Sequence, residues 1–207
     1  REELEPLCDL AVRALDEIID HQKYPIDAAE KSTKARRSLG IGYIGLAHYL
    51  AKKGYKYDQK LAWRQVDKLT EAFQFYLLSA SNTLAKEKGP CSAFKSTKYS
   101  DGILPIDTYK KDVDELVNKR ELTYDWEWLR KEIKEHGLRH STLSAQMPSE
   151  SSSVVSNATN GIEPPRDYLS VKKSKKGPLK QIVPEYNKLK NFYTLLWDMK
   201  GNEGYIN

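Results

Sequence analysis

Cysteine and methionine are scarce in this chain, whose 207 residues include two of each. Cys8 and Cys91 lie far apart and belong to no CxxC or Cys/His spacing, which argues against a disulfide framework and against a zinc site. The sequence also lacks a signal peptide and any apolar run long enough to span a membrane. We therefore expect a protein of the reducing cytoplasm that has no membrane partner.

An excess of charge of one sign is also absent. The chain has 34 Lys and Arg against 29 Asp and Glu, and the basic residues are scattered among the acids. The net charge of +5 is too diffuse to indicate nucleic-acid binding, so no DNA partner is expected. The four histidines, at positions 21, 48, 136 and 140, have no metal-ligand spacing, and we predict no metal site.

Apolar residues recur at helical spacing in several stretches, which predicts a helix-rich fold. Residues 2–21 form one such helix, and its expected buried stripe is Leu4, Leu7, Ala11, either Ala14 or Leu15, and Ile18. Residues 58–88 form the longest helix, and its apolar centre extends beyond one stripe, so we expect burial nearly all round. A last helix is predicted from Glu185 to Met199.

Shorter elements connect these helices. Asp107 and Asp125 precede helical patterns and are predicted N-caps. Residues 141–147 suit a short buried strand. Alternating residues on either side of a "SKKG" turn predict a β-hairpin near 168–183, in which Gly177 supplies a positive φ.

Three glycines are spaced closely in "LGIGYIG", residues 39–45. They do not follow the GxGxxG order of a dinucleotide site after a clear strand. Close backbone packing, where a strand turns into a helix that ends at Gly54, is the favoured interpretation.

Five serines crowd the stretch "MPSESSSVVSNATNGIEPP", residues 147–165. Ser151 or Ser152 is expected to cap a short helix there, and the exposed amides of a first helical turn bind phosphate without basic side chains. Glu150 would repel a phosphate, so its carboxylate must turn away. A serine-rich surface turn is the alternative, and the pattern alone leaves both open.

Four blocks resemble the large, catalytic subunit of class I ribonucleoside-diphosphate reductases: "RRSLGIGYIGLAHYLAKKG", "GILPIDTYKKD", "HGLRHSTLSAQMPSESSSVVSNATNGIEPPR" and "LLWDMKGNEGYIN". The likeness covers essentially the whole chain, yet only part of the family's subunit, from within its second half. It implies that residues 1–207 are a single partial domain, the C-terminal half of the family's ten-stranded α/β barrel, truncated at both ends. A cloned piece and one product of a split gene are both compatible with this.

The resemblance also implies a substrate site. In the family, the segment matching Pro148, Ser149, Glu150, Ser151 and Ser152 holds the substrate's diphosphate through backbone amides and hydroxyls. At the position of Ser151 the family commonly has threonine, which keeps the hydroxyl.

The activity implied is reduction of ribonucleoside diphosphates to deoxyribonucleoside diphosphates by a thiyl-radical mechanism. Cys8 and Cys91 match none of the family's thiol motifs. We therefore predict no catalytic residue in this chain and no activity when it is alone.

The resemblance implies several partners: the ribonucleoside diphosphate, the rest of a dimeric large subunit, a dithiol reductant, and a radical-generating small subunit with a dinuclear metal centre. No cofactor is assigned to this chain itself. Two alternatives stay open: a non-catalytic module that keeps the phosphate loop to bind a nucleotide or partner, and a cobalamin-dependent reductase with the same barrel.

Overall fold

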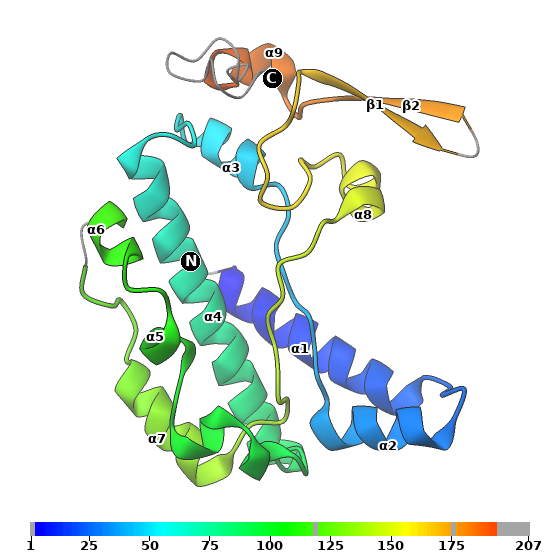
Figure 1. Cartoon of the computed structure of the whole chain (residues 1–207), viewed down its shortest axis with the longest axis vertical. Coiled ribbons are helices and arrows are strands. Elements are labelled where there is room, and N and C mark those ends of the chain that lie inside the picture. Colours follow the sequence, from blue (N-terminus) through cyan, green and yellow to red (C-terminus); the bar gives the residue numbers. More distant parts are fainter. Residues whose placement is uncertain (1–2, 118–119, 175–176, 194–207) are drawn as a thin grey trace. The chain divides into compact units, whose positions relative to one another are not determined.

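The computed structural model describes residues 3–117, 120–174 and 177–193. It divides the chain into two compact units, and each unit combines two segments of the sequence (Figure 1). Unit 1 is Arg1–Ile41 with Gln65–Ala145, and unit 2 is Gly42–Arg64 with Gln146–Asn207.

Unit 1 is helical among its described residues. Its elements are α1 (Leu4–His21), α2 (Asp27–Arg36), most of α4 (Lys60–Lys88), the 3-10 turns η1 (Phe94–Ser96) and η2 (Lys98–Asp101), α5 (Pro105–Thr108), α6 (Val113–Val117) and α7 (Trp126–His136). The helices predicted at 2–21 and 58–88 are confirmed to within two residues at each end. Helix α2 was not predicted because it has no buried residue and therefore no apolar stripe.

The centre of α4 is buried nearly all round, as predicted. Leu77 and Leu78 are fully buried although they point in different directions from the helix axis. Phe75 stacks on Tyr124 with ring centroids 4.7 Å apart and meets the edge of Trp126 at 5.3 Å. Helix α4 is therefore the central helix around which unit 1 packs.

The buried stripe predicted for α1 is partly wrong. Leu7 and Ile18 are 58% and 53% exposed. The buried residues of α1 are Cys8, Val12, Asp16 and Ile19. Two apolar stripes lie next to each other on this helix, and spacing alone does not decide which one faces the core. A buried ionic cluster centred on Asp16 fixes the rotation of α1 about its own axis.

In this cluster, Asp16 pairs with two arginines and a histidine. Its Oδ1 accepts a hydrogen bond from Arg37 Nε at 2.6 Å, and Arg139 Nε lies 3.3 Å from the same oxygen. Arg37 also binds Asp20 through Nη1 at 2.8 Å. Burial alone would raise the pKa of Asp16, but the hydrogen bond from Arg37 and the charge of Arg139 hold that pKa below its usual value.

His140 completes the cluster as a neutral ring. Its Nδ1 lies 2.9 Å from Ser81 Oγ and its Nε2 lies 3.1 Å from Asp16 Oδ1. The Ser81 hydroxyl therefore donates to Nδ1, while the proton on Nε2 is donated to Asp16. Burial lowers the pKa of His140 to about 4, against the attraction of Asp16.

The His140 ring is expected to make the stability of unit 1 dependent on pH. Because its folded pKa of about 4 lies below its value in the unfolded chain, the unfolded state binds more protons between pH 6.5 and 4. The free energy of unfolding should therefore fall as the pH drops through that window, by about 1 kcal/mol per pH unit. Urea unfolding at several pH values measures this slope.

The variant His140→Gln keeps a side-chain amide that can donate to Asp16, and it should flatten the profile between pH 6.5 and 4. The exposed His21→Gln serves as the matched control. A wild-type slope that survives in His140→Gln would contradict the assignment.

One of the two predicted N-caps is correct. Asp125 accepts a hydrogen bond from the Trp128 amide at 2.8 Å at the start of α7. Asp107 instead lies inside α5, where its carboxylate accepts from the amide of Leu104 at 2.7 Å. Proline at the first position of α5 starts the helix two residues before Asp107.

The predicted strand at 141–147 is extended and paired, but over a short length. Ile41 forms a parallel bridge with Ser144. The Leu39 amide donates to the Thr142 carbonyl, and the Ile41 amide donates to the Leu143 carbonyl, both at 2.9 Å. Within the described residues this pairing is an isolated bridge and not part of a longer sheet.

Unit 2 joins short helices to a β-hairpin. Its elements are α3 (Leu46–Lys52), the first turn of α4, α8 (Glu150–Val155), β1 (Leu169–Ser174), β2 (Gly177–Ile182), α9 (Tyr186–Leu189) and the 3-10 turn η3 (Lys190–Phe192). The predicted hairpin is confirmed: β1 and β2 pair antiparallel, Leu169 opposite Ile182, and Gly177 has a φ of 115°. The tip of its turn lies outside the described residues.

The helix predicted at 185–199 is only partly correct. Glu185 has a positive φ of 51°, α9 follows it for one turn, and η3 replaces the α-helix from Lys190. Tyr193 is buried, whereas Phe192 is 40% exposed. The remainder of the predicted helix lies outside the described residues.

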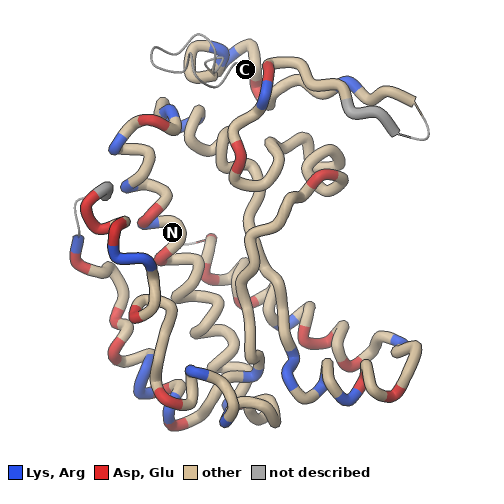
Figure 2. The backbone as a smooth tube through the Cα atoms, viewed as in Figure 1, with Lys and Arg blue, Asp and Glu red and all other residues tan. Residues whose placement is uncertain are grey.

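Basic and acidic residues are interspersed along the helices (Figure 2). Exposed pairs such as Arg13 with Glu87, 2.7 Å apart, account for part of this mixture. None of the helices among the described residues is long and apolar enough to cross a lipid bilayer.

Candidate functional site

The serine-rich stretch forms the short helix α8, and its N-cap is Ser149. The Ser149 carbonyl accepts hydrogen bonds from the amides of Ser152 at 2.8 Å and Ser153 at 3.2 Å. The prediction that Ser151 or Ser152 caps this helix is therefore wrong by two or three residues. Both of these serines lie inside the first turn.

The other end of α8 is closed by its own backbone. Asn157 has a positive φ of 50° and its amide donates to Val154, while the amide of Ala158 donates to Ser153 at 2.9 Å. This is the Schellman arrangement, which asparagine accommodates because it tolerates the left-handed conformation. The C-terminal end of α8 is thus closed after about a turn and a half of helix.

Ser149 is bound to the loop that follows α8. Its amide and its hydroxyl both donate to Asn160 Oδ1, each at 3.0 Å. The hydroxyl oxygen accepts in turn from the Gly161 amide at 2.9 Å. The start of α8 and residues 160–161 therefore form one hydrogen-bonded unit.

The glycine-spaced motif supports the same loop from its other side. Gly45 has a positive φ of 78°, and its amide donates to the Thr159 carbonyl at 3.1 Å. The Leu46 amide donates to the Gly161 carbonyl at 3.3 Å. The amides of Gly45 and Leu46 are therefore bound to carbonyls of the loop, which agrees with the packing interpretation of this motif.

The five predicted site residues lie together at the start of α8. Pro148, Glu150, Ser151 and Ser152 are exposed, and Ser149 is half-buried. The Ser152 hydroxyl donates to the Ser149 carbonyl at 2.7 Å. Among the described residues, the amide and hydroxyl of Ser151 have no acceptor, so Ser151 is the donor best placed for a ligand.

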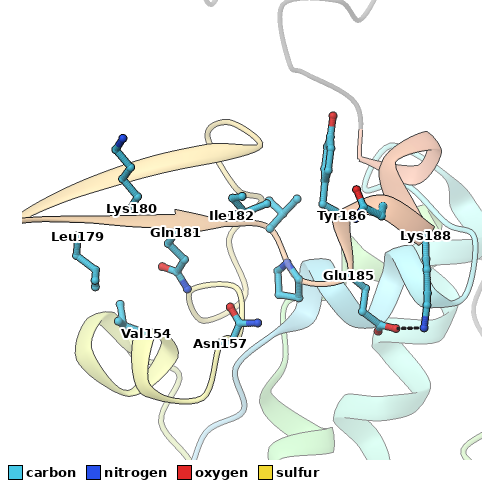
Figure 3. A pocket seen from close by; sticks show the side chains of 12 residues that line it. Val154, Asn157, Leu179, Lys180, Gln181, Ile182, Glu185, Tyr186 and Lys188 are labelled. Atoms are coloured by element: carbon cyan, nitrogen blue, oxygen red, sulfur yellow. Dashed lines mark ion pairs between the residues drawn. The ribbon is translucent and has the colours of Figure 1, made fainter.

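A surface cavity of about 640 Å³ lies elsewhere in unit 2, between α8 and the hairpin. In Figure 3, Leu179 and Gln181 point from β2 toward Val154 of α8 and toward Asn157, which lies just after the end of that helix. Glu185 forms an ion pair with Lys188 at the other end of the cavity, with 3.8 Å between Oε1 and Nζ. The five residues of the serine loop do not line this cavity.

Both cysteines are buried free thiols. Burial raises the pKa of Cys8 to about 11 and also raises the pKa of Cys91. A buried thiol with a raised pKa is a poor nucleophile and reductant. The two side chains therefore behave as core residues.

Glu132, Glu135 and His136 form a group on α7 that was not predicted as a site. Their ligand atoms lie within 4.8 Å of one another. Glu135 and His136 follow Glu132 by three and four residues, which places all three on one helical face. This spacing is the sequence signal that could have predicted the group. Glu132 already pairs with Lys86, so part of its charge is compensated.

The protein-family model of the barrel domain of ribonucleotide reductase matches residues 1–202 of this chain. The chain belongs to the ribonucleotide reductase family.

Its relatives include alpha subunits from bacteria and from a phage. It is 58% identical over 196 residues to the "Ribonucleoside-diphosphate reductase subunit alpha" of Haemophilus influenzae, covering 95% of this chain and 26% of that protein. It is 59% identical over 188 residues to the "Ribonucleoside-diphosphate reductase 1 subunit alpha" of Escherichia coli, covering 91% of this chain and 25% of that protein. The alpha subunit of bacteriophage T4 is 43% identical over 208 residues.

The resemblance found in the sequence is thus confirmed. The chain spans about a quarter of the length of these relatives.

Proposed function

We propose that the complete protein reduces ribonucleoside diphosphates to deoxyribonucleoside diphosphates, and that this chain supplies the loop that binds the substrate's diphosphate. The loop is Pro148, Ser149, Glu150, Ser151 and Ser152. The observation that carries the proposal is the unused amide and hydroxyl of Ser151 at the exposed start of α8, in a chain that belongs to the reductase family.

The chemistry at this loop is binding and orientation. α8 is only six residues long, so its dipole is weak and the anion must be held mainly by individual donors. An amide and a hydroxyl from the same residue can both donate to phosphate oxygens, and hydrogen bonds to a charged acceptor are stronger than neutral ones. The Glu150 side chain is exposed to solvent at this point, which is compatible with a carboxylate directed away from the ligand.

The rest of the reaction belongs to parts outside this chain. We propose that the thiols which carry the radical and the reducing equivalents come from the remainder of the large subunit, since both cysteines here are buried. A radical-generating small subunit with a dinuclear metal centre and a dithiol reductant complete the enzyme, and the large subunit is dimeric. No residue of this chain is assigned to the metal.

We also propose that both units belong to one domain, the ten-stranded α/β barrel. The parallel pairing of Ile41 with Ser144 supports this, because parallel neighbours are the pairing that a barrel of alternating strands and helices requires. The free thiols of Cys8 and Cys91 support a location in the reducing cytoplasm.

The proposal predicts a specific effect of Ser151→Pro in the complete enzyme. Proline removes both the amide donor and the hydroxyl of Ser151, and it is tolerated in the first turn of a helix. The loss of two hydrogen bonds to a charged phosphate should weaken binding of a ribonucleoside diphosphate by about 3 kcal/mol, or roughly a hundredfold. Equilibrium binding of cytidine diphosphate to the large subunit measures this.

Ser151→Ala is the matched control, because it keeps the amide and removes only the hydroxyl. It should weaken binding by a smaller factor than Ser151→Pro. Equal effects of the two substitutions would count against a site centred on the amide, and an unchanged affinity in both would show that the loop does not hold the diphosphate.

A further inference from the structure

We propose that Asn160, acting through Ser149, is a positioning residue that holds the diphosphate loop in its binding conformation. The inference rests on the proposed function, because it concerns how the same loop is held. It assigns to the Ser149 side chain a role inside the protein and leaves contact with the substrate to Ser151.

Every polar group of Ser149 is engaged within the protein. The amide and hydroxyl donate to Asn160 Oδ1, and the hydroxyl oxygen accepts from Gly161. The carbonyl accepts from the amide and hydroxyl of Ser152 and from the amide of Ser153. A Ser149 hydroxyl that turned toward a substrate would leave Asn160 and Gly161 without their partner.

The orientation of the Asn160 amide follows from these contacts. Two donors of Ser149 point at one atom, which must therefore be the oxygen. The amide nitrogen is then directed at Glu163 Oε2, 3.4 Å away. Asn160 and Ser149 are both half-buried, so the hydrogen bonds between them are partly shielded from competing water.

The segment that carries Asn160 is itself fixed. The carbonyls on either side of Asn160, those of Thr159 and Gly161, accept the first amides of α3 from Gly45 and Leu46. Gly45 is in the left-handed region, and a Cβ at this position would lie 3.7 Å from Ala158 Cβ. The hydrogen bonds from Gly45 and Leu46 therefore hold the loop in place. The hydrogen bonds between Asn160 and Ser149 then fix the start of α8 relative to that loop.

This anchoring has a functional consequence. α8 is too short to hold its first turn rigid by its own hydrogen bonds. An amide that must be ordered at the moment of binding contributes less affinity than one already in place. Asn160 thus keeps the Ser151 donors in the geometry that the diphosphate needs.

The test uses the complete large subunit with its small subunit and cytidine diphosphate as substrate. Asn160→Ala and Ser149→Ala should each raise KM about tenfold while kcat changes less than about twofold, since only a binding contribution is lost. The double variant should also show about a tenfold rise, because the two residues act as one unit. Ser149→Thr keeps the hydroxyl and should restore the wild-type KM.

Asn187→Ala, an exposed asparagine of the same unit, is the control and should leave KM unchanged. A hundredfold rise in the double variant would show two independent contributions and overturn the inference, as would a wild-type KM in Asn160→Ala. If Ser151→Pro weakens binding while Asn160→Ala does not, the positioning role fails and the proposed function stands. If neither affects binding, both fail.

Discussion

Replacing Asp16 with alanine is expected to lower the free energy of unfolding of unit 1 by about 4 kcal/mol, because it leaves buried charges without their partner. Asp16 is fully buried. Its carboxylate compensates Arg37, which is only 4% exposed, and it also contacts Arg139 and His140. Arg37 would retain Asp20, whose carboxylate is partly exposed, as its remaining acidic partner in the cluster.

Urea unfolding followed by tryptophan fluorescence measures this change, since Trp126 is buried in the core of the same unit. Asp9→Ala is the matched control on the same helix. Asp9 pairs with Arg13 at the surface, so its loss should cost less than about 1 kcal/mol. Similar losses in the two variants would contradict the role assigned to the buried cluster.

Glu71→Ala is expected to lower the free energy of unfolding of unit 1 by about 3 kcal/mol. The reason is that this one carboxylate of α4 accepts hydrogen bonds from several donors at and before the start of α7. Its Oε1 accepts from the amides of Thr123 at 2.6 Å and Tyr124 at 3.2 Å and from the indole of Trp126 at 3.2 Å. Its Oε2 lies 2.6 Å from Arg120 Nη2. The variant loses all of these acceptors at a site that is 8% exposed.

Glu87→Ala on the same helix provides the comparison, and the same unfolding measurement applies. Glu87 pairs with Arg13 in solvent, so its removal should leave the unfolding midpoint nearly unchanged. If Glu71→Ala also left the midpoint unchanged, the carboxylate would not be what fixes residues 123–126 on α4.

The elements that the sequence predicted well have strong local signals. Helix α4 keeps its apolar spacing over its whole length and stops just before Gly89, and the hairpin has alternating residues around Gly177. Helix α2 has no apolar stripe, and the N-cap at Asp107 was misplaced because Pro105 starts α5 earlier. The local sequence pattern predicts a helix or strand only where that element buries a periodic apolar face or ends at a stop signal such as glycine.

The helix that carries the candidate site was predicted in approximate position and not in detail. Serines ahead of a short apolar run located the start of α8, and the family resemblance gave the loop its expected ligand. The sequence did not reveal that Ser149 caps the helix, or that Asn160, eleven residues later, accepts its two hydrogen bonds. A contact between side chains on opposite ends of a loop leaves no periodic signal.

By itself, the sequence determined the family, the long helices, the hairpin and the place of the serine loop, since these depend on motifs and on spacing within one element. Only the tertiary structure decided which stripe of α1 faces the core, how Asp16 is compensated, and which donors of the loop stay available. Those outcomes depend on partners such as Arg139, His140 and Asn160, which come from distant parts of the chain. Burial and hydrogen bonding between such partners arise only when the chain folds, so a one-dimensional pattern does not contain them.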